Sequence, residues 1–162
     1  MLKINNMTQC ALLIAAGLQH LVLLPDSDAY VGRQTSYWAA NVPLRPSCIV
    51  QPHTTEEVSQ LIKILAHADG PFALRSGGHT QWAGSNDIHN GVTIDLGRMT
   101  NVSYDAQSTL ASVQPGPKWV DLYFGLLEHG VCVTGGREGN VGIAGFLTGG
   151  GNSYYAGLHG LG

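Results

Sequence analysis

The chain has 162 residues, of which 44% are hydrophobic and only 12% are charged, a composition typical of a folded protein rather than a disordered one. Its length suits a single domain. The formal net charge of -3 leaves no basic excess to neutralise a nucleic acid, and no apolar run is long enough to cross a bilayer. We therefore expect neither a nucleic acid nor a membrane as a partner.

The first apolar segment, within residues 1–18, has two interpretations. Lys3 followed by an apolar stretch is typical of a signal peptide, but several polar residues dilute the stretch. The alternative is an amphipathic first helix with Leu12, Ala15 and Ala16 facing the core, which fits the spacing slightly better. Both interpretations stay open, and so does the localisation of the protein. A signal peptide would direct it to secretion.

The clearest unit of the sequence combines two strands and a helix. A short strand at 21–24 comes first, and a second strand at 47–50 precedes Thr54, which can cap a helix with Glu57 three residues on. Apolar residues then recur on one helical face, at Val58, Leu61, Ile62 and Leu65. The helix stops before a strand at 72–74, so we predict a βαβ unit with parallel strands.

Two further strands are predicted at 92–96 and 109–113, and we expect them to be neighbours in one sheet. Another helix face follows, marked by Trp119, Leu122, Tyr123 and Leu126. This helix ends at Gly130, and a strand at 131–133 after it indicates a second βαβ-like unit. The predicted fold class is α/β, with no linker or internal repeat to divide the chain.

The loop after the strand at 72–74 is the first candidate site and reads Arg75-Ser76-Gly77-Gly78-His79-Thr80. It should lie at the carboxyl edge of the sheet, where α/β folds usually bind ligands. Adjacent glycines let a backbone bend closely around a ligand, and amide groups there can point at a pyrophosphate, to which Arg75 can add positive charge. A Gly-Gly pair after a strand is most often only a turn, so this motif alone does not decide.

The second candidate element is the glycine-rich segment 134–151. Its glycines recur too often for a stable helix or an ordinary strand, so we expect tight turns or a close approach to a ligand. Apolar residues interleave with the glycines, which a solvated tail would not need, and a packed ligand cradle is therefore favoured over a tail. Neither candidate element matches a P-loop or a Rossmann fingerprint, and no histidines or cysteines have the spacing of metal ligands.

Several motifs follow one another along the chain: Tyr37-Trp38, Pro46-x-Cys48-Ile49-Val50-x-Pro52, Arg75-Ser76-Gly77-Gly78-His79, Gly91-Val92-Thr93-Ile94-Asp95-Leu96, Gln114-Pro115-Gly116 and Gly142-x-x-Gly145-x-x-x-Gly149-Gly150-Gly151. In this order they resemble the FAD-linked oxidases of the berberine bridge enzyme type, within the p-cresol methylhydroxylase and vanillyl-alcohol oxidase superfamily. The resemblance runs from about Cys10 to the C-terminus. Phe146 replaces a histidine common in the plant members, which favours fungal relatives.

This resemblance implies an FAD-binding PCMH-type domain of two small α/β subdomains over residues 42–162, preceded by an N-terminal segment, residues 1–41. It implies an FAD whose 8α-methyl carbon is bonded to the imidazole of His79, a neutral nitrogen nucleophile. A non-covalent contact is the alternative. Some members form a second link through a cysteine at the position of Glu138, so no second link is expected here. The implied cofactor-binding residues are Arg75, Ser76, Gly77, Gly78, His79, Thr80, Pro115, Gly116, Gly135, Gly136, Asn140, Val141, Gly142, Gly145, Gly149 and Gly150.

The resemblance also implies an oxidase that removes a hydride from an alcohol, sugar or secondary-metabolite carbon and passes the electrons to molecular oxygen. Family members often join the counterparts of Cys10 and Cys48 in a disulfide. Asp95, Asp121 and Tyr123 are interpreted as structural residues, and Glu138 as solvated.

The family continues beyond the glycine-rich segment with a domain that binds the small-molecule substrate and carries the residues that take its proton. We therefore expect a chain truncated before the substrate domain, assign no catalytic residue, and expect this chain alone to be inactive. The alternative is a truncated, non-catalytic remnant or an incomplete gene model that retains the signature of the FAD domain.

Overall fold

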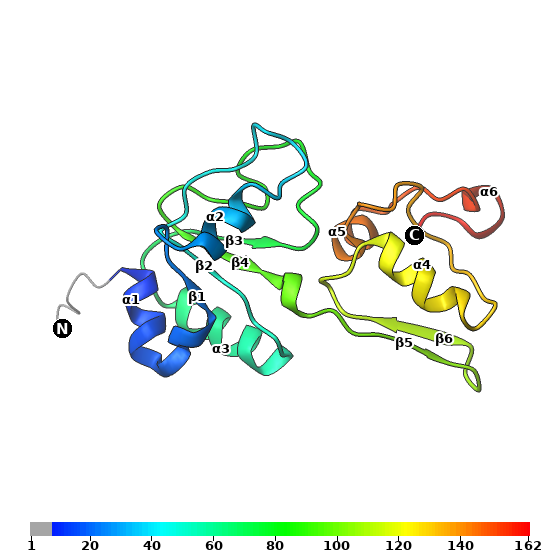
Figure 1. The fold of residues 1–162 in the computed structure, drawn as a ribbon, viewed down its shortest axis with the longest axis horizontal. Helices are drawn as coiled ribbons and strands as arrows, with labels where there is room; N and C mark the ends of the chain where they lie inside the picture. The colour runs from blue at the N-terminus through cyan, green and yellow to red at the C-terminus, as the bar shows by residue number, and fades with distance from the viewer. Residues whose placement is uncertain (1–7) are drawn as a thin grey trace. The chain divides into compact units, whose positions relative to one another are not determined.

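The computed structural model describes residues 8–162, which divide into two compact units (Figure 1). Unit 1 contains the chain up to Arg75 together with Thr80–Asp95, and unit 2 consists of Ser76–His79 and Leu96–Gly162. Each unit combines helices with strands, so the predicted α/β fold class is confirmed. Lys3 of the possible signal peptide lies outside the described residues.

Within the described residues, unit 1 is built on a four-stranded sheet in the order β1-β2-β4-β3. The strand β1 is antiparallel to β2, whereas β2 and β3 are both parallel to β4. The predicted βαβ unit is therefore confirmed, with β4 between its two strands. Every residue of β2 and β4 is buried, as expected for central strands. The strand bounds are Val22–Leu23 (β1), Cys48–Val50 (β2), Phe72–Arg75 (β3) and Val92–Asp95 (β4).

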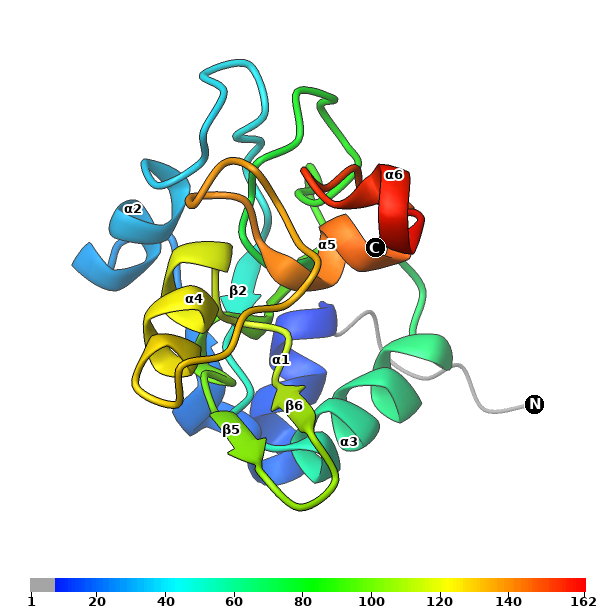
Figure 2. The same cartoon turned by 90° about the vertical axis from the view of Figure 1, so that its right-hand side faces the viewer.

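The helix between β2 and β3, α3 (Thr55–Ala66), begins at the predicted capping box. The Thr54 hydroxyl accepts a hydrogen bond from the Glu57 amide at 3.2 Å, and the Glu57 carboxylate accepts one from the Thr54 amide at 3.3 Å. Leu61 and Leu65 are fully buried, as the periodicity predicts. In two views at right angles, α3 lies beside the N-terminal helix α1 (Gln9–Leu13) (Figure 2).

The face predicted for the first helix is wrong. The helix α1 runs into a π-helical segment, η1 (Ile14–Leu18), and a 3-10 turn, η2 (Gln19–Leu21), and Gly17 inside η1 has a φ of +86°. The larger side chains of Leu13 and Leu18 fill the core on the two sides of this kink. Leu12 is half-buried, and Ala15 and Ala16 are exposed, because the kink breaks the regular helical periodicity on which the prediction was based.

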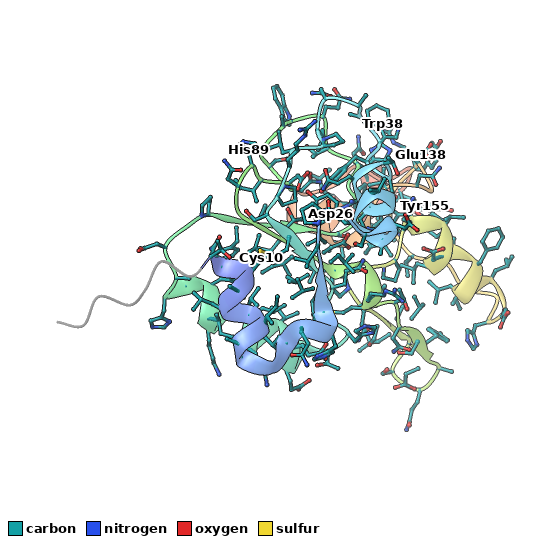
Figure 3. The ribbon with its side chains drawn as sticks, turned by 60° about the vertical axis from the view of Figure 1, so that its left-hand side comes forward. Cys10, Asp26, Trp38, His89, Glu138 and Tyr155 are labelled. Atoms are coloured by element: carbon teal, nitrogen blue, oxygen red, sulfur yellow. A yellow bond between two sulfur atoms is a disulfide. The ribbon has the colours of Figure 1, made fainter. Side chains whose placement is uncertain are left out.

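A disulfide joins Cys10 on α1 to Cys48 on β2, across a sequence separation of 38 (Figure 3). This is the pair that the family resemblance implies, and its presence is confirmed. The remaining cysteine, Cys132, is free and exposed. The N-terminal helix is thus covalently fixed to the central sheet of unit 1. Helix α2 (Asp28–Gln34) also belongs to this unit and begins after the N-cap residue Ser27.

Unit 2 has a β-hairpin and three short helices among its described residues. Its core consists of the buried side chains of Trp119, Leu122, Leu126 and Ile143. Helix α4 supplies the first three of these residues and α5 the fourth. The bounds are Leu96–Arg98 (η3, a 3-10 turn), Val102–Asp105 (β5), Leu110–Val113 (β6), Trp119–Leu127 (α4), Ile143–Thr148 (α5) and Ala156–His159 (α6).

Three predictions about this part of the chain are wrong. The strands β4 and β6 are not neighbours, because β6 pairs with β5, a strand that the sequence analysis did not predict. Residues 131–133 form no strand, so the predicted second βαβ-like unit is not formed, and Val131 and Val133 pack as loop residues against the core of unit 2. The glycine-rich segment contains a helix, α5, because Gly145 is its only internal glycine and Ile143 and Phe146 pack on the core.

No helix among residues 8–162 is both long and apolar enough to span a membrane.

Candidate functional site

The two glycine-rich elements predicted from the sequence meet at Gly77 and Gly142, both in unit 2. A Cβ atom added to Gly77 would lie 2.5 Å from the Cα of Gly142, and one added to Gly142 would lie 2.5 Å from the amide nitrogen of Gly77. Both obstacles are backbone atoms, which cannot rotate away as a side chain can. Glycine is therefore required at both positions, and the contact brings residues 76–79 against residues 141–142.

The predicted Pro115-Gly116 motif belongs to the same site. The Ser76 hydroxyl donates a hydrogen bond to the Pro115 carbonyl at 2.6 Å. The Gly116 amide donates to the Met99 carbonyl at 2.9 Å, and a Cβ at Gly116 would lie 2.5 Å from that same oxygen. Gly116 thus lets the chain turn tightly, so that Pro115 can hold Ser76.

The loop at Gly77 and Gly78 presents backbone amides. Gly78 is buried and has a φ of +69°, a left-handed conformation that favours glycine. Within the part of the chain that the structure describes, the amides of Gly77 and Gly78 donate no hydrogen bond to a protein acceptor. Gly78 is buried, and buried amides are nearly always paired, so this part of the loop is suited to an anionic ligand.

His79 is half-buried at the end of this loop, and its charge interacts with that of Glu138. Oε1 of Glu138 accepts hydrogen bonds from the Asn140 backbone amide at 3.0 Å and from the Asn140 side chain at 3.1 Å. These hydrogen bonds, with a smaller contribution from His79, hold the pKa of Glu138 below its usual value. Glu138 is exposed, and it is the position at which the family resemblance implies a cysteine in some members.

Trp119 supports the predicted cradle at Gly135 and Gly136. A Cβ on either glycine would overlap the indole ring, so both glycines are needed for packing on Trp119. The Tyr123 hydroxyl donates to the Gly136 carbonyl at 2.7 Å, and the Gly135 amide donates to the Ser153 hydroxyl at 3.2 Å. From the sequence, Trp119 was predicted only as a helix-face residue, and Tyr123 as a helix-face residue with a structural role. Their spacing of four residues places the two side chains next to each other on the helix, and this was the one local sign that they could act together.

The other predicted glycines are less constrained. Gly145, Gly149 and Gly150 are exposed, and a Cβ added to Gly145 or Gly150 would meet nothing within 4 Å. Gly150 has a φ of +65°, a left-handed conformation that favours glycine. No steric contact explains Gly145.

Two of the predicted site residues belong to unit 1. The buried guanidinium of Arg75 donates from Nη1 to the Arg33 carbonyl at 2.6 Å and from Nη2 to the Ser36 hydroxyl at 2.8 Å. The Thr80 hydroxyl accepts a hydrogen bond from the Trp82 amide at 3.3 Å. The Arg75 side chain is therefore used in packing within unit 1.

The residues interpreted as structural have structural contacts. The Asp95 carboxylate is paired with Arg33, and Oδ2 of Asp121 accepts a hydrogen bond from the Lys118 amide at 2.8 Å, at the start of α4. Among the described residues, no group of histidine, cysteine or acidic side chains could hold a metal ion.

Comparisons with known proteins agree with this site. The FAD binding domain family matches residues 46–162, most of the chain, and the chain belongs to this family. It is 40% identical over 154 residues to the FAD-dependent monooxygenase sdcF of Emericella nidulans, which is 94% of this chain and 32% of that protein. The family resemblance drawn from the motifs is thereby confirmed, including its fungal character.

Solved structures share the fold. A berberine bridge enzyme-like protein of Physcomitrella patens, in the variant D396N, has a TM-score of 0.82 at 23% identity, over 96% of this chain and 33% of its own. Glucooligosaccharide oxidase from Acremonium strictum has a TM-score of 0.80 at 25% identity, over 96% of this chain and 32% of its own. The FAD of that oxidase is described as 6-S-cysteinyl, 8α-N1-histidyl.

This chain spans about a third of the length of sdcF and of both solved structures. It is an FAD-binding domain of the kind found in FAD-dependent oxidoreductases.

Proposed function

We propose that this chain holds the pyrophosphate of FAD at the amides of Gly77 and Gly78 and bonds the flavin covalently through His79. The observation that supports this most is the contact between Gly77 and Gly142, which lies beside amides that have no acceptor among residues 8–162. A pyrophosphate is an anion whose oxygens would satisfy those amides. The residues that are present therefore fit the cofactor of the family.

The proposed bond joins a nitrogen of the His79 imidazole, which is nucleophilic in its neutral form, to the 8α carbon of the flavin. A C–H bond of the 8α-methyl group would be broken, the flavin would take up the two electrons, and molecular oxygen would then reoxidise it. His79 comes directly after Gly78 in the loop, and it is half-buried. Glucooligosaccharide oxidase, whose flavin is linked through both a histidine and a cysteine, supports a histidyl link here as well. The carboxylate of Glu138 cannot replace the cysteine sulfur, so we propose a single link.

The remaining implied residues would shape the site. Ser76, Pro115 and Gly116 fix the loop, while Asn140 and Val141 belong to the segment that leads to Gly142. We propose that residues 42–162 make up the FAD-binding domain, in agreement with the family match over residues 46–162. In this assignment Gly135, Gly136, Gly145, Gly149 and Gly150 line the remainder of the cradle.

The reaction that we propose is the oxidation of an alcohol, a sugar or a secondary-metabolite carbon, with the electrons passing to molecular oxygen. Bound FAD would supply the hydride acceptor. The residues of this chain bind and orient the cofactor, and none of them is assigned as the acid or base that acts on the small-molecule substrate. We propose that this acid or base lies in the part of the relatives' sequence that this chain does not span. We also propose that the chain alone is inactive.

The test is acid precipitation of the chain after incubation with FAD. We expect yellow, fluorescent flavin on the washed precipitate of the unchanged chain, and its release in His79→Ala. His89→Ala is the matched control, because His89 is an exposed histidine in the same part of the sequence, and it should keep the flavin (Figure 3).

Flavin that stays attached in His79→Ala would show that the wrong residue is assigned. A colourless precipitate from the unchanged chain would contradict covalent attachment, and it would fit a protein that retains the fold of the family without its cofactor.

A further inference from the structure

We propose that Asp95 and Arg33 are positioning residues for the loop that carries His79. Together with Arg75 and Tyr37 they form a buried ionic cluster in unit 1, which fixes the residue from which this loop starts. The consequence for flavin attachment rests on the proposed function, but the effect on the loop itself does not.

Asp95 is the centre of this ionic cluster. Its side chain is fully buried at the end of β4, and Arg33 on α2 binds both of its oxygens, Nε to Oδ2 at 2.6 Å and Nη2 to Oδ1 at 3.1 Å. This two-bond geometry fixes the orientation of both side chains, which a single contact would not do. It also ties α2 to the carboxyl end of β4.

Arg75 ends β3 directly beside Asp95, its register partner on β4. Its side chain is almost entirely buried, and its Nη1 lies 3.9 Å from the Oδ2 of Asp95. Its hydrogen bonds go instead to neutral acceptors on Arg33 and Ser36. The Tyr37 ring covers the guanidinium, with the ring centroid 3.7 Å from the Cζ atom.

The charges of this cluster do not cancel. Burial raises the pKa of Tyr37 far above its usual value, so the phenol is neutral, and burial lowers the pKa of Arg75. Two guanidinium groups thus share one carboxylate, and the face of the Tyr37 ring stabilises the excess positive charge. Loss of the Asp95 charge would leave two neighbouring cations with no carboxylate, so the ends of α2, β3 and β4 depend on it.

The path of the chain gives this cluster its proposed role. The chain passes from unit 1 to unit 2 after Arg75 and after Asp95, and it returns to unit 1 after His79. Both residues from which it leaves unit 1 therefore belong to the ionic cluster. The loop 76–79 starts at an arginine that contacts Arg33, Ser36, Tyr37 and Asp95, and the position of that arginine fixes the start of the loop.

The first experiment compares Asp95→Asn with Asp26→Asn in the chain without FAD. Asp26 is an exposed aspartate in the turn before α2 of the same unit, so it is a matched control (Figure 3). Hydrogen exchange of peptides that cover β3, which pairs with β4 up to Arg75 and Asp95, should become about tenfold faster in Asp95→Asn and stay unchanged in Asp26→Asn. Peptides from α3 should keep their protection, which shows that unit 1 is still folded.

The second experiment measures how fast acid-stable flavin forms at saturating FAD. We expect the rate to fall about tenfold in Asp95→Asn and also in Arg33→Lys, since lysine keeps the charge but cannot make the two-bond contact with Asp95. If α3 loses its protection in Asp95→Asn, the same two measurements on Arg33→Lys test the proposal instead.

The proposal is overturned if exchange in β3 and the attachment rate are both normal in Arg33→Lys, or in a folded Asp95→Asn. If the unchanged chain attaches no flavin, the proposed function fails, and the exchange measurement still decides whether the ionic cluster fixes the strand end from which the loop starts.

Discussion

At Gly77, one methyl group decides whether two segments of the backbone can meet. In Gly77→Ala the new Cβ would lie 2.5 Å from the Cα and 2.6 Å from the amide nitrogen of Gly142, so the loop has to move. We expect the free energy of unfolding to fall by about 1–3 kcal/mol, as for other overpacked positions. Acid-stable flavin should fall with it, by about tenfold or more.

Gly157→Ala is the matched control for Gly77→Ala, because a Cβ at Gly157 in α6 of the same unit would meet nothing within 4 Å. Urea unfolding and flavin content should both stay at the unchanged level in this variant. Equal stability and flavin content in Gly77→Ala and Gly157→Ala would show that the contact with Gly142 is not needed.

Tyr37 offers a second test at the scale of one residue, because its ring and its hydroxyl have separate contacts. The ring covers Arg75, and the hydroxyl donates to the Asn86 carbonyl at 3.2 Å. Tyr37→Phe keeps the ring and should have a small effect, whereas Tyr37→Leu should cost about 1–2 kcal/mol more, because the cation–π contact is lost. Urea unfolding of the two variants measures the difference. The cation–π interpretation is wrong if Phe and Leu destabilise equally.

The sequence predicted the glycines of the site better than the side chains that support them. Gly77 and Gly142 stand in recognisable local motifs, so their importance could be read from the sequence. Trp119, which occupies the space beside Gly135 and Gly136, was visible only as a helix-face residue, and Arg33 gave no local signal for its pairing with Asp95. Such contacts join residues far apart in the chain, and no local pattern specifies them.

Among the elements, α1 and β2 are joined by the disulfide between Cys10 and Cys48. Over a sequence separation of 38, the loop-entropy relation gives about 4 kcal/mol of stabilisation through the unfolded state. We expect a variant with Cys10→Ala and Cys48→Ala to unfold at lower urea than the oxidised chain. A reducing agent should bring the unchanged chain close to the variant. Equal midpoints under oxidising conditions would contradict this role.

The capping box of α3 should make stability depend on pH. Hydrogen bonds from the His53 and Thr54 amides hold the pKa of Glu57 below its ordinary value, so the ionised form favours the folded chain. This contribution is fully present above the unfolded pKa of about 4.5 and is lost as the pH falls through the lower folded pKa.

Glu57→Ala should therefore cost about 1 kcal/mol near neutral pH, and less as the pH falls below about 4. Urea unfolding of both chains across this range measures the difference. A difference that stays constant down to pH 2 would contradict the assignment of the effect to the Glu57 carboxylate.

The sequence predicted most elements of unit 1 but not all pairings of strands. Thr54, Glu57 and the apolar positions of α3 are local signals, and they gave the βαβ unit. The strand β5 was missed because Val102–Asp105 is half exposed and short, and without it β6 was paired wrongly. The Asp105 carboxylate, which accepts from the Gln107 amide at 2.9 Å and the Ser108 hydroxyl at 2.6 Å, closes the hairpin locally.

At the scale of the whole molecule, the order of the motifs predicted the family, and the FAD binding domain match confirms it. The assignment of residues 76–79 to unit 2 could not be predicted, since these residues lie in the chain between two segments of unit 1. Periodicity describes runs of residues and has no means to assign a short loop to another unit. Because residues 76–79 pack in unit 2, Gly77 meets Gly142, and this contact forms the candidate site.

The central claim is a covalent bond between FAD and His79, and mass spectrometry of a tryptic digest tests it most directly. Cleavage after Arg75 and Arg98 gives the peptide Ser76–Arg98, in which His79 and His89 are the histidines. After incubation of the chain with FAD and acid washing, we predict that this peptide carries the flavin and that fragmentation places it on His79. Flavin on His89, on a peptide that contains Cys132, or on no peptide would contradict the account.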